Sequence, residues 1–482
     1  MTRAVKSLSP DFPVPSLADW RALAEKGLKG APFETLIGRT ADGLAIQPLY
    51  AADPDRAVLR ARPGLSGDRD RPWDLRTLID HPEPARANAL AHDALTKGAA
   101  SLLLRLDPAG EAGVTVGSQD DLARALDGVL LDLAPVALDA GFMGAEGANW
   151  LAVLAKGAPE APLAFHLDPL SAFAREGASA GPVAAHVNAA AQAGARHAGA
   201  YPRASLFLAS GRFVHEAGGT EAQELGVMAA AVVAYLRALE AAGIAPAEGL
   251  KRIVLGLSAD ARYPVQIAKL RAARAIWARI AEACGSDAPA VIEVRSSARM
   301  LADRGVHNNL LRLTAAAFAG AVGGAQAVVL DSFTAPLGGD NPLSRRQARN
   351  TQLILMEESH LGRVADPAGG AFFFEQLTDD LARAGWAVFQ AIEAEGGLAA
   401  ALLSGSLADD VAGAREALIA STRDGSAPIL GVSLYPADED PVTIDPRPAH
   451  AVPAPDVRQA GADDACTPFA PTRLSDHVEA HP

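Results

Sequence analysis

The segment at residues 204–219, ASLFLASGRFVHEAGG, carries the side chains whose types and spacing best suit chemistry. It begins with an apolar run that is typical of a buried strand, and it ends in polar residues and glycines. α/β enzymes present catalytic side chains in this way, where a strand ends and a helix follows. Phe213 and His215 lie two positions apart, so on a strand they would share one face, separated by roughly 6.5 Å. Only the histidine can exchange protons or donate a hydrogen bond through its side chain. Whether the segment is catalytic therefore depends on which of the two residues would face a substrate.

A second histidine lies at the end of another predicted strand, in the sequence PLAFHLDP. His166 and Asp168 would point to the same face of that strand. Such a pair can serve proton transfer. A hydrogen-bonded pair with a structural role at the rim of the fold is the interpretation that we favour.

Arg295 ends the predicted strand AVIEVR and is followed by Ser296 and Ser297. An arginine with hydroxyl groups at the end of a strand suits a phosphate or a carboxylate. An arginine that pairs with an acidic neighbour explains the pattern equally well, and both readings stay open. Glu293 lies two positions before Arg295 and is predicted to be a buried salt-bridge partner rather than a catalytic base.

The elements that would position these residues form a repeating pattern from about residue 63 onward. Short apolar strands alternate with amphipathic segments of helical length, which is typical of parallel sheets. The predicted strands are residues 73–79, 100–106, 128–133, 162–167, 205–209, 252–257, 290–295 and 327–330. Eight strands separated by helices predict an α/β fold of the (β/α)8 TIM-barrel type. A doubly wound open sheet is the alternative, weakened because no GxGxxG motif follows a strand.

The remaining parts of the chain flank this barrel, which we place at residues 61–385. Residues 1–60 contain one clear helix and a hairpin-like piece with an Asp-Gly turn, so they resemble an arm rather than a domain. Residues 386–435 are predicted to be a helical extension. Residues 436–482 are rich in proline and are predicted to form an extended tail that a partner could order.

The composition limits the classes of function. The chain has 482 residues, of which 49% are hydrophobic, and its formal net charge is −14. These values favour a folded, acidic, cytoplasmic protein and argue against a nucleic-acid partner. Cys284 and Cys466 are the only cysteines and are far apart, so neither a disulfide framework nor a structural zinc site is expected. The apolar run at residues 313–330 is broken by two glycines and is predicted to be a buried helix and strand, not a membrane span.

Several longer motifs, read together, resemble one family. They are ARNTQ at 348–352, RVADPAGGAFFFEQLTDDLARAGW at 363–386, RPWDLR at 71–76, AKLRAARAIWARI at 268–280, HNNLLR at 307–312 and GVSLYP at 431–436. With SGRFVHEAGG they follow the order found in cobalamin-dependent acyl-CoA mutases, above all methylmalonyl-CoA mutase. The resemblance covers about residues 60–436. It implies a (β/α)8 barrel with an acyl-CoA along its axis and a separate C-terminal domain that supplies the cobalamin.

The chain departs from the active members of that family at the positions that carry the chemistry. Where they have a histidine, in a stretch like SGYHMQEAG, this chain has Phe213, and where they have a tyrosine, in RPWTIRQY, it has Leu78. The resemblance assigns hydrogen bonding of the thioester carbonyl to that histidine and shielding of the radical to that tyrosine. The DxHxxG motif, whose histidine ligates cobalt, does not occur, and ESHLG at 358–362 lacks its aspartate. We therefore expect no catalytic residue and no cobalamin domain in this sequence.

The resemblance leads to two hypotheses about function. The first is the non-catalytic small subunit of a heterodimer, with an N-terminal arm that packs against a large subunit. That partner would bind adenosylcobalamin and interconvert methylmalonyl-CoA and succinyl-CoA. The second is an active acyl-CoA mutase that works with a separately encoded cobalamin-binding protein, with His215 in place of the missing histidine. If the chain binds an acyl-CoA at all, we expect Arg71, Arg295 and Ser297 to bind it; no membrane partner is expected.

Overall fold

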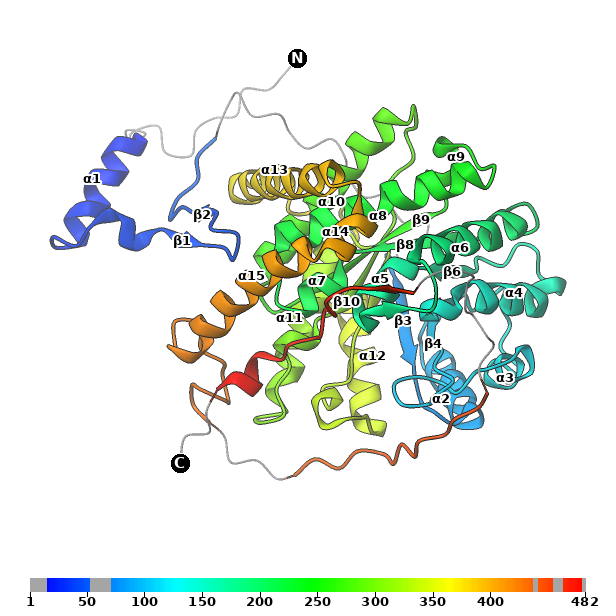
Figure 1. Cartoon of the computed structure of the whole chain (residues 1–482). Coiled ribbons are helices and arrows are strands. Elements are labelled where there is room, and N and C mark those ends of the chain that lie inside the picture. Colours follow the sequence, from blue (N-terminus) through cyan, green and yellow to red (C-terminus); the bar gives the residue numbers. More distant parts are fainter. Residues whose placement is uncertain (1–14, 53–70, 437–440, 454–462, 479–482) are drawn as a thin grey trace, which may run out of the picture.

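Eight parallel strands close into a barrel at the centre of the chain (Figure 1). The structure is a computed structural model and describes residues 15–52, 71–436, 441–453 and 463–478. Around the barrel the strands follow the order β10-β11-β3-β4-β5-β6-β8-β9. Their bounds are β3 (Asp74–Ile79), β4 (Ser101–Arg105), β5 (Val136–Asp139), β6 (Ala164–Leu167), β8 (Ser205–Ser210), β9 (Ile253–Ala259), β10 (Ile292–Ser296) and β11 (Ala327–Val329). The predicted (β/α)8 barrel is confirmed, and the open sheet is excluded.

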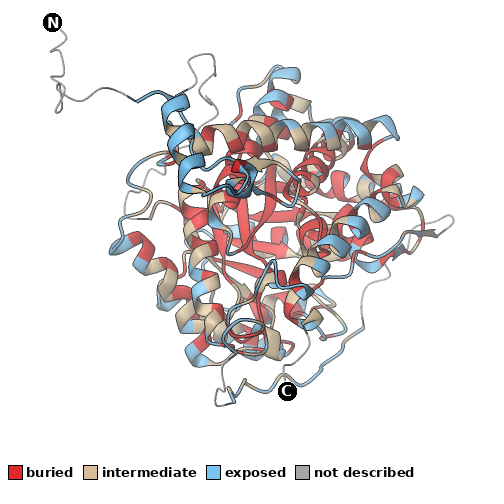
Figure 2. Cartoon of the chain, turned by 90° about the vertical axis from the view of Figure 1, so that its left-hand side faces the viewer, coloured by how far each residue is buried: buried red, intermediate tan, exposed pale blue. Residues whose placement is uncertain are grey.

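Helices connect successive strands and cover the outside of the barrel, as a parallel sheet buried on both faces requires. They are α2 (Pro84–Thr96), α3 (Gln119–Ala125), α4 (Gly144–Leu154), α5 (Pro169–Glu176), α6 (Val183–Ala198), α7 (Arg212–Glu216), α8 (Glu221–Ala241), α9 (Pro246–Leu250), α10 (Tyr263–Ala283), α11 (Asn308–Val322) and α12 (Pro342–Glu357). Figure 2 shows the buried residues gathered on the strands and on the inner faces of these helices. In α10 an apolar stripe with helical spacing is buried at all its positions, which are Ile267, Leu270, Ala273, Ile276 and Ile280.

One predicted strand is wrong. Residues 128–133, GVLLDL, form turns, and the strand of this repeat is β5, which begins after Pro135. Gly128 has a φ of +71°, and Leu130 and Leu133 are 61% and 73% exposed. A short apolar run is compatible with either a strand or a loop. Which of the two forms depends on the tertiary contacts that bury the residues.

The apolar run at residues 313–330 becomes the end of α11 and the strand β11, separated at Gly323 and Gly324 as predicted. Among the described residues, one helix is long and apolar enough to cross a membrane, and that helix is α8. Of its apolar window, 78% is buried inside the structure, because α8 is packed between the barrel and α13 (Phe372–Ala394). The length of α8 therefore reflects its place in the core.

The N-terminal arm stands off the barrel in Figure 1. It contains α1 (Leu17–Gly27), a 3-10 helix at Phe33–Leu36 and a two-stranded hairpin of β1 (Gly38–Arg39) and β2 (Ala45–Ile46). At the other end of the chain, α13 runs through the predicted boundary at residue 385 and packs on α8 and α10. It is followed by α14 (Leu398–Ser404) and α15 (Ser406–Arg423).

The described parts of the C-terminal tail run along the rim of the barrel at the carboxyl ends of the strands. Figure 1 shows residues 441–453 along the lower edge and residues 463–478 across the barrel. The backbone hydrogen bonds that hold the tail join Asp445 to Asp340, Val452 to Pro108, Cys466 to Gly177, Phe469 to Ala174 and Thr472 to Glu216. In addition, β12 (Asp464–Ala465) pairs with β7 (Ala178–Ser179). The predicted extended tail is thus ordered against its own barrel.

Candidate functional site

A cavity of about 800 Å³ lies at the carboxyl ends of the strands, where barrel enzymes carry their active sites. We call it the mouth cavity. Charged residues from several strand ends line it, among them Arg105, Asp139, His166, Arg212 and Arg295. Phe213, Phe469 and Pro471 also line it, the last two from the C-terminal tail. The tail therefore covers part of the opening through which a ligand would enter.

Phe213 does not lie on a strand, contrary to the sequence-based expectation. β8 ends at Ser210, and residues 212–216 form the short helix α7. Gly211 makes this turn possible, because a Cβ atom there would lie 2.1 Å from the carbonyl oxygen of Glu224. Phe213 is 4% exposed, and its ring meets the ring of Phe469 edge to face, with the centroids 5.0 Å apart. The position at the end of β8 is thus filled by an aromatic contact.

His215 is directed away from the mouth cavity, because residues two apart on a helix do not share a face. It is completely buried. Its Nε2 lies 3.1 Å from Ser297 Oγ, and its Nδ1 lies 3.3 Å from a carboxylate oxygen of Glu224. Burial, with help from Arg299, lowers the pKa of His215. The expectation that Phe213 and His215 face the same way is wrong.

Arg295 lines the mouth cavity, whereas the hydroxyl of Ser297 is used inside the protein. Arg295 Nη1 lies 3.2 Å from Asp139 Oδ2, so the reading as an arginine with an acidic partner is confirmed. Its Nε is buried without a hydrogen-bond partner among the described residues. Ser297 Oγ accepts from the backbone N–H of Arg299 at 3.2 Å and contacts His215. Ser297 is therefore a cap of the loop after β10.

Asp139 is the centre of the charge in the mouth cavity. Arg105 and Arg295 each lie 3.2 Å from its carboxylate, and Arg175 lies 3.7 Å away. Burial would raise the pKa of Asp139, but the three arginines outweigh it and hold that pKa well below its ordinary value. Arg212 adds a further positive charge, although burial and Arg295 lower its pKa to about 10. One carboxylate shared by several arginines suits anions of small size.

His166 and Asp168 do not form the predicted pair. β6 ends at Leu167, and Asp168 caps α5 by accepting from the backbone N–H of Ser171. Tyr235 donates to the same carboxylate at 2.5 Å, and burial raises the pKa of Asp168 to about 6. His166 has a φ of +46°, and neither ring nitrogen has a hydrogen-bond partner in the described parts of the chain. The left-handed conformation at the strand end separates the two side chains.

Replacement of His166 by glutamine is expected to remove one source of acid sensitivity. Burial lowers the pKa of His166 to about 4, despite Glu293 at 3.9 Å. The unfolded chain therefore takes up this proton from pH 6.5 downward while the folded chain does so only near pH 4. The histidine contributes no pH dependence above pH 6.5, and between pH 6.5 and 4 it costs the wild type on the order of 3 kcal/mol. Urea unfolding at a series of pH values should show that the free energy of unfolding falls less steeply below pH 6.5 for His166→Gln than for the wild type. Equal slopes for the two proteins would contradict the lowered pKa of His166.

The axis of the barrel holds a cluster of charged side chains below the mouth cavity. Arg76 Nη1 donates to Glu293 at 2.6 Å, Arg76 Nη2 to Asp74 at 2.7 Å and Arg76 Nε to Ser101 at 2.9 Å. Glu293 is therefore a buried salt-bridge partner as predicted, although its partner is Arg76. Leu78 belongs to an apolar cluster on the same inner side of the wall, formed with Leu103, Ala137, Ala164 and Val329.

Arg71 lies at the opposite end of the barrel from Arg295. It precedes β3 and lines a cavity of about 750 Å³ with residues from the amino ends of other strands, such as Ala100 and Gln326. Its guanidinium lies 3.5 Å from Glu357 and donates to the carbonyl of Gly98. The three residues expected to bind an acyl-CoA are thus not brought together.

Comparison with known proteins decides the family. A profile described as methylmalonyl-CoA mutase matches residues 63–460. This chain belongs to the methylmalonyl-CoA mutase family. It is 39% identical over 470 residues to the methylmalonyl-CoA mutase small subunit of Streptomyces virginiae, with 92% of this chain and 74% of that one covered. It is 38% identical over 428 residues to the probable small subunit of Mycobacterium tuberculosis, covering 84% and 67%. For the small subunit of Propionibacterium freudenreichii subsp. shermanii the identity is 31% over 469 residues, covering 90% and 71%.

The motifs of the mutase family meet in pairs in the structure. Gln352 of ARNTQ accepts from the indole of Trp73 in RPW. Arg271 of the AKLRAAR motif binds Asp366 and Glu375, which lie in the segment ADPAGGAFFFE. Arg312 of HNNLLR donates to the carbonyl of Leu430 beside GVSLYP. These contacts show that the motifs hold the fold together.

Reasoning from the sequence missed several residues of this mutase-family site. Arg105 ends β4 and could have been found by that signal, whereas Asp139 ends β5, whose predicted position was residues 128–133. No sequence pattern pointed to Arg212 or Phe469. Arg212 lies on the short helix α7 and Phe469 lies in the C-terminal tail, and both elements pack over the end of the barrel. The string GASAG at residues 177–181 matches the GxSxG pattern of hydrolases by its letters. Its Ser179 is buried and donates to the carbonyl of Gly181 beside β12, so it is not an exposed nucleophile.

Proposed function

We propose that this chain is the non-catalytic small subunit of a heterodimeric, cytoplasmic methylmalonyl-CoA mutase. In this proposal the large subunit binds adenosylcobalamin and interconverts methylmalonyl-CoA and succinyl-CoA, and this chain supports assembly or stability. The observation that carries the proposal is Phe213 at the end of β8, buried under Phe469 of the tail. The relatives named as small subunits support the same role.

The missing side chains argue against catalysis by this chain. Phe213 cannot donate a hydrogen bond, and Leu78 has neither a ring nor a hydroxyl. Losing one donor to a developing charge costs about two to three orders of magnitude in rate. Two other histidines line the mouth cavity, His166 on β6 and His186 on α6, but neither lies at the position after β8 that aligns with the family's histidine.

The alternative function, an active mutase that uses His215, finds less support. His215 is completely buried and is held between Ser297 and Glu224. It does not line the mouth cavity. To reach a substrate in the mouth cavity it would have to break both contacts and α7 would have to rearrange.

The mouth of this barrel does not fit a corrin ring. Adenosylcobalamin is the cofactor of the family, and a corrin presented to this barrel would have to face the carboxyl ends of the strands. Phe469 and Pro471 lie there, and the adjacent Thr472 N–H donates to the carbonyl of Glu216 at 2.8 Å. We therefore propose that this chain binds no cobalamin by itself.

An acyl-CoA along the barrel axis is also disfavoured. A CoA ester that reached both Arg71 and Arg295 would have to pass the cluster of Arg76, Glu293 and Asp74. Displacing those contacts would leave buried charges without partners, which costs several kcal/mol. We propose that the described conformation holds no acyl-CoA along its axis.

Co-purification tests the proposed function. A tagged form of this chain, expressed together with a methylmalonyl-CoA mutase large subunit from the same cells, should retain it at a one-to-one ratio. The complex should turn over methylmalonyl-CoA with adenosylcobalamin, while this chain alone, with or without an added cobalamin-binding protein, should show no turnover. A chain that binds no large subunit would overturn the heterodimer. Turnover by this chain with a cobalamin-binding protein, lost in His215→Ala, would establish the alternative.

A further inference from the structure

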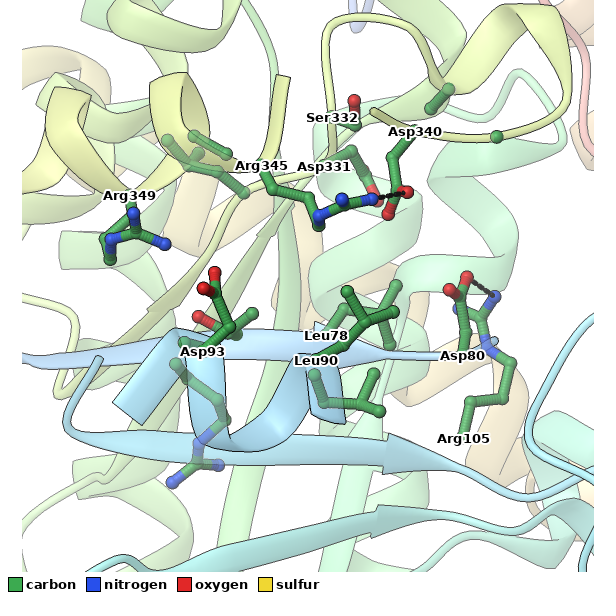
Figure 3. A pocket seen from close by; sticks show the side chains of 18 of the residues that line it. Leu78, Asp80, Leu90, Asp93, Arg105, Asp331, Ser332, Asp340, Arg345 and Arg349 are labelled. Atoms are coloured by element: carbon green, nitrogen blue, oxygen red, sulfur yellow. Dashed lines mark hydrogen bonds and ion pairs between the residues drawn. The ribbon is translucent and has the colours of Figure 1, made fainter. Parts of the chain in front are cut away.

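The barrel wall opens on one side, between β3 and β11. β3 pairs with β11 only from Asp74 to Arg76, whereas its second half pairs with β4 alone. A cavity of about 320 Å³ lies in this opening, between the helices α2 and α12 (Figure 3). We call it the side cavity. It adjoins the mouth cavity and shares Arg105, Ala112 and Asp331 with it, but residues of α2 and α12 line the side cavity alone.

Most of the arginines that line the side cavity are neutralised by carboxylates of this chain. The pairs are Arg76 with Glu293, Arg105 with Asp139, Arg345 with Asp340 and Asp445, and Arg447 with Asp80. Two of these pairs include Asp445 or Arg447, so the tail helps to close the outer side of the cavity. The remaining lining arginine is Arg349 of the ARNTQ motif, and it has no ion pair within 4 Å in the described parts of the chain.

Arg349 is buried in the wall of the side cavity. It is 7% exposed, and its Nε has no hydrogen-bond partner among the described residues. Figure 3 shows its guanidinium on the side facing Asp93, whose carboxylate is already bonded to Lys97. Burial lowers the pKa of Arg349, although Asp93 opposes the shift. Asp93 interacts with this guanidinium at a distance but is bonded to Lys97, so an anion that enters the cavity can form the direct ion pair that Arg349 lacks among the described residues.

Apolar side chains form part of the wall near Arg349, beside the polar Asp93 and Gln352. They are Leu78, Leu90, Ala94, Leu330 and Ala348. A cavity that combines an apolar surface with a few polar groups and a charged anchor is typical of sites for small organic ligands. The cavity is at the low end of the size range for such ligands, which excludes a nucleotide or a whole CoA.

The acidic residues of the side cavity limit the charge of its ligand. Asp80, Asp331 and Asp340 line the outer part, and Asp93 lies across from Arg349. Since Asp80 and Asp340 already neutralise Arg447 and Arg345, Arg349 is the positive charge left for a ligand, which favours a monoanion over phosphate or another polyanion. A single carboxylate can instead form two parallel hydrogen bonds with one guanidinium.

We propose that the side cavity binds a small monocarboxylate with a short apolar chain, its carboxylate on Arg349 and its chain against Leu78 and Leu90. This site goes beyond the proposed function and does not depend on it. It adds a ligand-binding role to a motif that otherwise serves the fold.

Calorimetric titration of the full-length chain with hexanoate tests the site. Wild-type protein should bind hexanoate but not hexan-1-ol, which has the same chain without the charge. Arg349→Gln should weaken binding about tenfold or more, because a hydrogen-bonded charge pair is lost. Arg346→Gln, an exposed arginine on the same helix, should leave binding unchanged.

Leu90→Trp provides a second variant that keeps the charge and fills the apolar side. It should weaken hexanoate binding more than acetate binding, and it decides the matter if Arg349→Gln fails to fold. No binding of hexanoate to the wild type at millimolar concentration would overturn the proposal, as would equal affinity of the wild type and both variants. Neither outcome bears on the heterodimer, which co-purification tests separately.

Discussion

Replacement of Glu224 by alanine is expected to lower the free energy of unfolding by about 3–5 kcal/mol. Glu224 lies on α8 and is completely buried. One carboxylate oxygen accepts from Lys269 Nζ at 2.5 Å and lies 3.3 Å from His215, and the other accepts from the backbone N–H of Ser258 at 2.6 Å. The alanine variant would leave the ammonium of Lys269 buried without a counter-charge. Urea unfolding followed by circular dichroism measures the change.

The matched control lies on the same helix. Glu240 of α8 is exposed, so Glu240→Ala should change stability by no more than about 0.5 kcal/mol. A double variant, Glu224→Leu with Lys269→Met, should recover most of the loss, since replacing a buried ion pair by apolar groups is often neutral. A Glu224→Ala variant within about 1 kcal/mol of the wild type would contradict the role of this cluster.

The pH dependence of the same variant gives an independent check. Burial would raise the pKa of Glu224, but Lys269 and His215 lower it to about 2, compared with an ordinary value of 4.5. A carboxylate with a lowered pKa contributes its full stability above the unfolded value and loses it as the pH falls. The difference between wild type and Glu224→Ala should therefore be constant above pH 4.5 and shrink between pH 4.5 and pH 2.

Removal of residues 1–31 is expected to weaken the proposed heterodimer by about a hundredfold while leaving the barrel folded. These residues include α1, which has a well-defined start in a capping box of Ser16 and Asp19. No residue of α1 is buried, and Leu17 and Leu23 are 56% and 69% exposed. An isolated helix of this length is marginal in water, so a partner surface is the simplest source of its stability. Analytical ultracentrifugation or titration with the large subunit measures the effect.

The arm has only a light connection to its own barrel, so its removal should cost little stability. The connection includes a hydrogen bond from the N–H of Ala222 to Asp42 and a ring contact between Tyr50 and Phe373, all of which the deletion keeps. A Leu17→Asp, Leu23→Asp double variant should reproduce most of the loss of affinity. Leu133→Asp, an equally exposed leucine on the barrel, serves as the matched control. Unchanged affinity in the deletion variant would show that the partner binds elsewhere.

The barrel and its family could be predicted because their signals are local in the sequence. Strands of the barrel are short apolar runs, and α10 shows its buried face as a 3.6-residue stripe from Ile267 to Ile280. The family motifs survive in sequence because residues such as Gln352 and Arg271 satisfy buried partners that allow few substitutions. The local signals failed at residues 128–133, where exposure and not composition decided against a strand.

The sequence gives the types of the residues near the candidate site, but it does not give their positions in the fold. The resemblance to the family predicts that Phe213 and Leu78 stand where active members have a histidine and a tyrosine. The sequence could not show that residues 212–216 leave the strand for a helix, because that turn depends on the close approach of Glu224 to Gly211. The helix turns His215 toward Ser297 and Glu224 and so removes it from the mouth cavity.

The sequence by itself determined that this chain has a mutase-family barrel, because the apolar strands and the family motifs are local patterns of residues. Tertiary structure alone decided which of the remaining charged residues can meet a ligand. Arg71 precedes β3 and Arg295 lies near the end of the parallel strand β10, so they lie at opposite ends of the barrel, but the pairing of Arg295 with Asp139 follows only from the closed barrel. The tail reaches the mouth cavity through its backbone hydrogen bonds to the barrel and through the contact of Phe469 with Phe213, more than half of the chain away. Contacts between residues so distant in sequence depend on packing and hydrogen bonding in the folded chain. A local sequence pattern does not encode such contacts.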